Sequence, residues 1–108
     1  MPATLAAFAS SDPEEARLLL DDFLESTRQD LGGLEAARAR GDLVVVARES
    51  HKLKGAALMV GALELANVAG QLESAAADRD WPQVGPLAAR LAGAVERLRL
   101  HVAGQAPA

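Results

Sequence analysis

The segment GDLVVVARESHKLKGAALMVG, residues 41–61, has the features of one complete helix with its two ends. Asp42 is a residue type that caps helix N-termini, and Gly41 and Gly61 are of the type that most often ends helices. Between these residues, apolar side chains recur at intervals of three and four, which is the helical period. The segment therefore predicts an amphipathic helix over 43–60. Its buried face is predicted to hold Leu43, Val46, Ala47, Ser50, Leu53, Ala57 and Val60.

The same pattern on either side of this segment predicts three more helices, over about 13–40, 62–78 and 81–102. Because the connections between them are short, consecutive helices are expected to be antiparallel neighbours. The predicted fold is all-α, a single domain over 1–108 that forms an up-down-up-down four-helix bundle. Residues 1–10 are compatible with a short extra helix, and 104–108 with a frayed tail. Pro86 predicts a kink or a delayed start in the last helix.

Composition excludes several classes of protein. The chain has 108 residues, no cysteine, 3% aromatic residues and a formal charge of −4. The absence of cysteine excludes disulfides and thiolate zinc sites and fits a reducing compartment. An acidic chain with few aromatic residues is a poor candidate for binding nucleic acid. No apolar run is long enough to span a bilayer and no basic segment opens the chain, so we expect a cytoplasmic monomer without direct membrane contact.

The second helix carries the side chains that could take part in a chemical reaction. His51 lies to the side of the predicted buried face, and Lys54 and Gly55 are its neighbours at the i+3 and i+4 positions. A glycine in a helix interior costs about 1 kcal/mol relative to alanine, so Gly55 is hard to explain by stability. It leaves room for another molecule to approach the imidazole. Lys54 supplies a mobile charge suited to an anion on that ring.

A neutral imidazole is nucleophilic at cellular pH and can accept a phosphoryl group and release it again. Such a transfer also needs in-line geometry and charge neutralisation, usually by a divalent metal. The chain has no glycine-rich phosphate loop and no obvious metal site, so a partner would have to handle nucleotide and metal. We therefore expect a carrier without autokinase activity.

The flank of the helix around His51 is a candidate docking surface. It combines exposed apolar positions with basic ones, on a chain that is acidic overall. The basic residues are more often solvated than in contact with phosphate, but they are placed to steer an acidic partner. The candidate docking residues are Val44, Arg48, Lys52, Leu58 and Met59. Leu58 and Met59 would instead be core residues if the helix were rotated from this projection.

The stretch His51-Lys52-Leu53-Lys54-Gly55-Ala56-Ala57, followed by Gly61-Ala62, Leu65-Ala66 and Leu72-Glu73, resembles the signature of histidine-containing phosphotransfer (HPt) domains. The resemblance is greatest to the C-terminal HPt domains of bacterial hybrid sensor kinases. It covers about 23 residues at its core, and the four-helix pattern extends it over nearly the whole chain.

The resemblance implies that His51 is phosphorylated, that Lys54 stabilises the phosphoryl group and that Gly55 leaves room for the receiver domain of a response regulator. The chain would be a phosphorelay intermediate that exchanges phosphoryl groups with receiver aspartates. It would need no cofactor of its own, because the receiver's pocket holds the magnesium. The partner receivers would include that of a parent hybrid kinase if the domain is part of a membrane-anchored one.

Other interpretations remain open. A lone helical histidine is usually an ordinary surface residue. For His51, the neighbouring Lys54 and Gly55 argue against this interpretation. A non-phosphorylated docking module that binds receivers is the main alternative. A histidine-kinase dimerisation hairpin and a metal-binding bundle fit less well. We assign no role to His101, and we place Gln71 and Glu73 on the polar face of the third helix.

Overall fold

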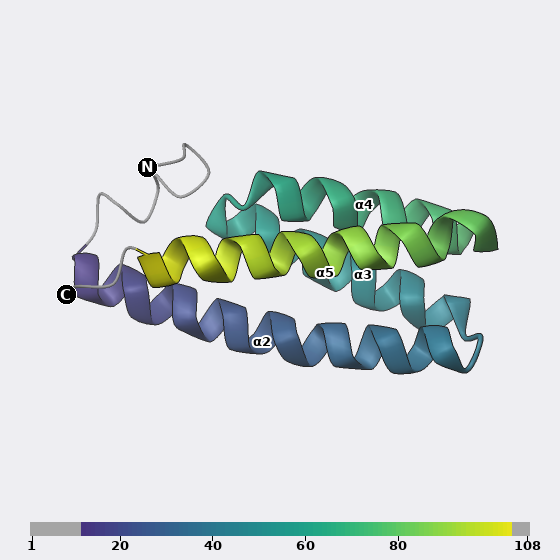
Figure 1. Cartoon of the computed structure of the whole chain (residues 1–108), viewed down its shortest axis with the longest axis horizontal. Coiled ribbons are helices and arrows are strands. Elements are labelled where there is room, and N and C mark those ends of the chain that lie inside the picture. Colours follow the sequence, from purple (N-terminus) through teal and green to yellow (C-terminus); the bar gives the residue numbers. More distant parts are fainter. Residues whose placement is uncertain (1–11, 105–108) are drawn as a thin grey trace.

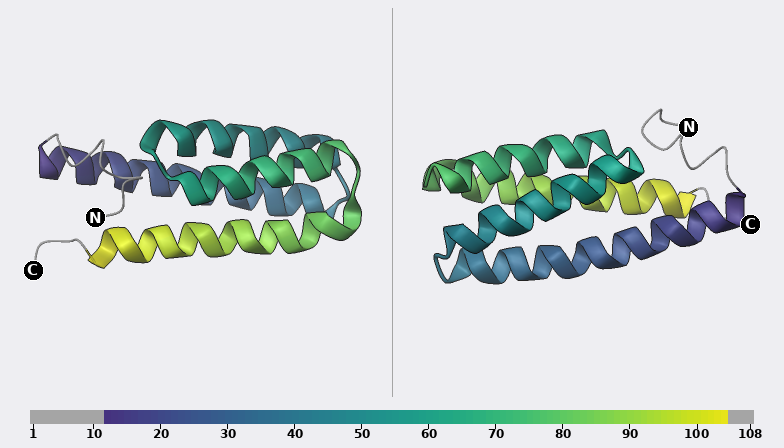
Figure 2. Two further views of the ribbon diagram at one scale, coloured as in Figure 1. Left: turned by 90° about the horizontal axis from the view of Figure 1, so that it is seen from above. Right: turned by 180° about the vertical axis from the view of Figure 1, so that it is seen from behind.

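The computed structural model describes residues 12–104, which form four α-helices and no strand. The helices are α2 (Pro13–Ala39), α3 (Leu43–Val60), α4 (Leu63–Ala77) and α5 (Trp81–Gly104). Consecutive helices run antiparallel, and α5 returns to pack against α2 as well as α4 (Figure 1). Two further views show that the first turns of α2 extend beyond the end of α3 (Figure 2). The predicted up-down-up-down bundle is confirmed.

The helix ends follow from local chemistry. The side chain of Asp12 accepts a hydrogen bond from the Glu14 N–H, and that of Asp42 accepts one from the Val45 N–H, at 3.0 and 3.1 Å. Both carboxylates satisfy an amide that the helix itself leaves without a partner. Gly41 and Gly61 follow α2 and α3 with φ of 76° and 74°, a left-handed conformation that glycine adopts without steric cost. The predicted boundaries agree with the observed ones to within about one residue, except at the C-terminus of the last helix.

The delayed start predicted for the last helix is wrong. α5 begins at Trp81 and continues through Pro86 to Gly104 without interruption. Pro86 removes only the backbone hydrogen bond to the carbonyl oxygen four residues earlier, which belongs to Pro82 in the first turn. Both prolines are exposed, so water has access to that carbonyl. The short helix expected over residues 1–10 and residues 105–108 of the expected tail lie outside the described part of the chain.

The core runs along the axis of the bundle. Each helix contributes at least one leucine that is fully buried, and these are Leu34, Leu53, Leu65, Leu72 and Leu91. Truncating a buried leucine to alanine costs about 2–5 kcal/mol, so these side chains contribute substantially to holding the four helices together. Across residues 12–104, no helix combines the length and apolar character needed to cross a membrane.

Candidate functional site

The imidazole of His51 projects outward from the middle of α3. The residue before it, Ser50, is fully buried, and its hydroxyl donates a 2.8 Å hydrogen bond to the carbonyl oxygen of Val46. One residue further along a helix turns the side chain by about 100°, which carries His51 from the core face to the surface. Its side chain is 69% exposed, as the predicted helix face requires.

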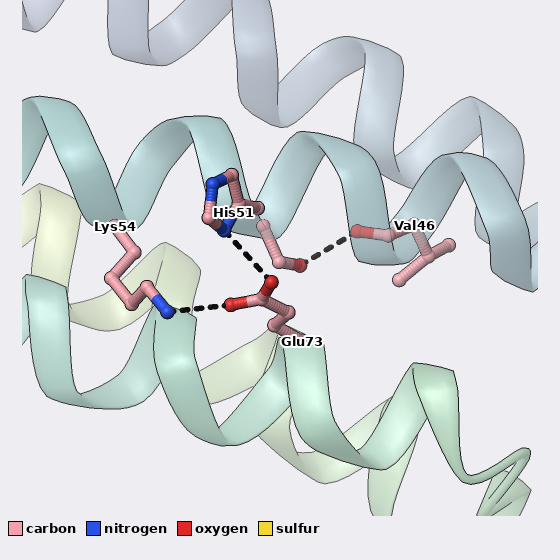
Figure 3. Close-up of polar contacts among 5 residues, drawn as sticks. Val46, His51, Lys54 and Glu73 are labelled. Carbon is pink, nitrogen blue, oxygen red and sulfur yellow. Dashed lines mark hydrogen bonds and ion pairs between the residues drawn. The ribbon is translucent and has the colours of Figure 1, made fainter.

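A carboxylate from the neighbouring helix joins His51 to Lys54. Glu73 on α4 lies 2.8 Å from the His51 Nδ1 through Oε2 and 2.8 Å from the Lys54 Nζ through Oε1. Figure 3 shows the three side chains converging, two from α3 and one from α4. Residues 51 and 54 are one helical turn apart, so a single carboxylate on the facing helix can contact both.

Glu73 determines which ring nitrogen of His51 is free. The hydrogen bond from Lys54 lowers the pKa of the Glu73 carboxyl below its ordinary value of 4.5, the bond from His51 lowers it further, and partial burial opposes both. The carboxylate is therefore ionised at neutral pH and only accepts hydrogen bonds. The His51 Nδ1 must then carry the proton, which leaves the lone pair of a neutral ring on Nε2. No residue within 12–104 forms a hydrogen bond with Nε2.

Lys54 is only partly exposed, at 35% of its side chain. Its ammonium has three N–H donors, of which Glu73 takes one. The remaining donors are available to an anion bound at the ring. The structure thus brings together two of the residues predicted from the sequence, His51 and Lys54, through a third that was not predicted.

Lys52 is a solvated charge, as expected, since its side chain is 58% exposed, but it is also paired with two carboxylates. Its Nζ lies 3.2 Å from Asp30 on α2 and 3.3 Å from Glu49 on its own helix. These hydrogen bonds, with Asp30 the larger cause, raise the pKa of Lys52 above its ordinary value. Its charge is balanced by two carboxylates and directed away from His51, toward α2. Sequence periodicity places Lys52 on the surface but does not say which acidic residues of α2 lie opposite it.

Gly55 is exposed and faces open space. A Cβ atom built on this residue would meet nothing within 4 Å. The fold of this chain therefore does not require glycine at position 55, although the residue lowers helix stability. The space beside the imidazole is open to another molecule, as the sequence predicts.

The remaining candidate docking residues line the surface of α3. Val44 and Leu58 are exposed, and Met59 is 85% exposed. Arg48 is also exposed and forms no ion pair with any residue of 12–104. These positions give α3 an apolar and basic outer flank on both sides of His51, but their role in docking stays a prediction.

Glu73 is the residue that sequence reasoning missed. We assigned it to the polar face of the third helix, although the Leu72-Glu73 pair was part of the resemblance. Its position 22 residues after His51 carries a signal only when the register of α3 against α4 is known. Gln71 lies on the exposed face of α4, as expected, and its Oε1 accepts a hydrogen bond from Arg90 on α5. Among residues 12–104, no cluster of three His, Cys, Asp or Glu side chains has the arrangement of a metal site.

Comparison with known proteins identifies the family. The model of the Hpt domain matches residues 18–101, which include all the site residues described above. The chain belongs to the Hpt domain family. Its fold is similar to that in the crystal structure of histidine-containing phosphotransfer protein B (HptB) from Pseudomonas aeruginosa PAO1, with a TM-score of 0.88 and 24% sequence identity. That similarity covers 97% of this chain and 91% of the other. No curated protein matches the sequence at a significant level.

Membership of the Hpt family gives the chain a general role. Hpt domains are phosphocarriers of two-component signalling without kinase activity, and they interact with receiver domains of response regulators. This chain therefore has a phosphotransfer role in two-component signalling.

Proposed function

We propose that His51 is the phosphoacceptor of a phosphorelay, taking a phosphoryl group from one receiver aspartate and passing it to the receiver of a response regulator. One observation carries this proposal. The His51 side chain is 69% exposed and its Nδ1 is bound to the carboxylate of Glu73, so that Nε2 faces no partner among residues 12–104. A nucleophile of this kind is both accessible and held in one tautomer.

The transfer step follows from this geometry. The lone pair of His51 Nε2 attacks the phosphorus of the aspartyl phosphate in line with the P–O bond to the carboxylate. The N–P bond forms as that P–O bond breaks, and the receiver's aspartate leaves with the electron pair. The proton on Nδ1 stays on the ring and is stabilised by Glu73. Donation to the next receiver is the reverse of this step.

Each neighbour has a separate task in the proposal. The Lys54 ammonium neutralises charge on the phosphoryl oxygens, and it is already held one turn from the ring by a 2.8 Å ion pair. Gly55 leaves the space through which the receiver approaches. One oxygen of Glu73 is bound to the Lys54 ammonium and the other to the neutral His51 ring, and we assign the magnesium that the transfer needs to the receiver's own pocket.

The outer flank of α3 is the proposed docking surface for the receiver. Val44, Leu58 and Met59 supply exposed apolar contacts, and Arg48 supplies a charge without a partner in 12–104. Lys52 borders the same surface, with its charge already balanced by Asp30 and Glu49. We expect the domain to act as a monomer, with one receiver bound at a time.

The proposal is tested by phosphoryl transfer from a purified receiver that carries labelled aspartyl phosphate. The wild-type chain should take up an acid-labile phosphate, and His51→Gln should abolish the labelling with unchanged helical circular dichroism. His101→Gln is the matched control and should retain it. Undiminished labelling of His51→Gln would refute the assignment of the phosphoacceptor.

The same experiment separates the proposal from the docking alternative. A non-phosphorylated adaptor would bind receivers equally well with and without His51, and the wild-type chain would take up no label. The apolar flank of α3 would serve either function, so binding alone does not distinguish them. Incubation with Mg-ATP in place of the phosphorylated receiver should give no label, because we expect no autokinase activity.

A further inference from the structure

A second glycine lies in a helix interior close to the site. Gly70 is in the middle of α4, one turn before Glu73. A Cβ atom on Gly70 would lie 3.3 Å from the Cδ of Lys54. Gly32, Gly33 and Gly55 are also in helix interiors, but a Cβ on any of them would meet nothing within 4 Å. The bare backbone at Gly70 therefore has a specific neighbour, the aliphatic stem of Lys54.

This contact defines the path of the Lys54 side chain. The stem leaves α3, passes over Gly70 and ends in the ion pair with Glu73, where the Nζ–Oε1 distance is 2.8 Å. Residues 70 and 73 are on the same side of α4, because they are three positions apart. Gly70 thus lies beneath the stem that Glu73 holds at its charged end.

We infer that Gly70 is a positioning residue for Lys54. The stem of Lys54 packs this closely against α4 because position 70 has no side chain, and this glycine thereby sets where the ammonium rests beside His51. The inference rests on the proposed role of Lys54 in phosphoryl transfer. It also explains why α4 keeps a residue that costs about 1 kcal/mol in a helix interior relative to alanine.

A larger side chain at position 70 should slow phosphoryl transfer more than a smaller one. Carbon atoms pack best at about 3.5–4.0 Å, so an alanine at position 70 requires Lys54 to move by a few tenths of an ångström. A valine adds two methyl groups on the same side and requires a larger displacement. Since an error of about 1 Å in a reacting geometry can lower a rate by about 100-fold, we expect reductions of about twofold for Gly70→Ala and about tenfold for Gly70→Val.

The first test needs no phosphorylation. The Glu73 carboxyl is titrated by carbon-13 NMR in the wild type, Gly70→Ala, Gly70→Val and the control Gly32→Ala. The hydrogen bond from Lys54 is the largest cause of the lowered pKa of Glu73. Displacing Lys54 should therefore move that pKa back toward 4.5, more in the valine variant than in the alanine variant. The pKa should not change in Gly32→Ala, and no change in either Gly70 variant would overturn the inference.

The second test is a double-mutant cycle on the transfer rate. Gly70→Val is measured with Lys54 and again with Lys54→Ala, because coupling between contacting residues appears as non-additivity. We expect about a tenfold loss with Lys54 present and less than a twofold loss without it. Equal losses in both backgrounds would mean that valine merely distorts α4, and would overturn the inference. Gly70→Ala keeps the cycle informative should the valine variant unfold, since alanine favours the helix.

Failure of this inference is distinguishable from failure of the proposed function. If the wild-type chain took up no label at His51, the phosphoacceptor assignment would fail. The titration of Glu73 would then still decide whether Gly70 sets the position of Lys54.

Discussion

Lys52 and Lys54 are two residues apart on the same helix, yet their ammonium groups form ion pairs with different neighbours. Lys52 is bound by Asp30 and Glu49 on the α2 side of α3, and Lys54 is bound by Glu73 on the α4 side. Of these three carboxylates, only that of Glu73 also contacts His51. The difference shows that proximity in sequence does not define this site. What defines it is which helix supplies the opposing carboxylate.

The largest expected difference between the α2 side and the α4 side of α3 is in how much the transfer rate depends on each lysine. Lys54→Ala should slow phosphoryl transfer to His51 by about 10- to 100-fold, because removing a charge placed on developing negative charge typically costs about that much or more. Lys52→Ala should change the rate by less than about twofold. The measurement is single-turnover transfer from a phosphorylated receiver at saturating concentration, so that weaker docking does not contribute. Similar losses for the two variants would remove the distinction between the two sides.

The carboxylates give the next comparison. Glu73→Gln keeps the shape of the side chain but removes the ionised acceptor, so the His51 ring is no longer held with its proton on Nδ1. We expect transfer to fall about tenfold, which corresponds to ~1.4 kcal/mol in the barrier. Asp30→Asn should leave the rate nearly unchanged. Nitrogen-15 shifts of the ring report the tautomer directly, and a ring that stays protonated on Nδ1 in Glu73→Gln would count against this role of Glu73.

Gly55 tests the open side of the site. Gly55→Ala should raise the free energy of unfolding by up to about 1 kcal/mol, since a Cβ there meets nothing in the chain and alanine favours the helix. The same variant should transfer phosphoryl groups more slowly, because the methyl group occupies space that the receiver needs. Thermal unfolding and transfer assays on Gly55→Ala and on the control Gly32→Ala check both effects. A faster Gly55→Ala would show that the receiver does not approach through this space.

The smallest expected effect is on the pH dependence of stability. The pKa of Glu73 is lowered by Lys54 and His51 in the folded chain, so its ion pairs stabilise the fold at pH values above the ordinary 4.5. This contribution is lost as the pH falls through the lowered pKa and the carboxylate is protonated. The free energy of unfolding of the wild type should exceed that of Glu73→Gln by less than about 1 kcal/mol near pH 6. The two values should be equal near pH 2. A difference that grows on acidification would contradict the sign of this effect.

The helices and the position of His51 were predictable because both depend on local patterns. The apolar period of α3 places Ser50 and Leu53 in the core and His51 outside it, and Asp42 and Gly61 define the ends of that helix. The exposure of Leu58 and Met59 follows from the same period. These features need only the geometry of one helix, which the sequence encodes directly.

Contacts between helices were not predictable in the same way. The pairing of Glu73 with His51, of Asp30 with Lys52 and of Gly70 with Lys54 depends on how far α3 is shifted along its neighbours. A shift of one helical turn, about 5.4 Å, would replace every partner without changing the apolar pattern of any single helix. The delayed helix start predicted near Pro86 is wrong for a related reason, whereas the kink predicted as its alternative stays a prediction. The effect of Pro86 depends on whether the freed carbonyl has access to water, which is a property of the assembled bundle.

The central claim is that one nitrogen of one histidine carries the phosphoryl group, and NMR of the phosphorylated chain tests it directly. Nitrogen-15 labelled protein is phosphorylated by a receiver, and the phosphorus–nitrogen coupling identifies the bonded atom. The account predicts coupling to Nε2 of His51, with Nδ1 protonated and bound to Glu73. Coupling to Nδ1 of His51, or to a nitrogen of His101, would contradict it.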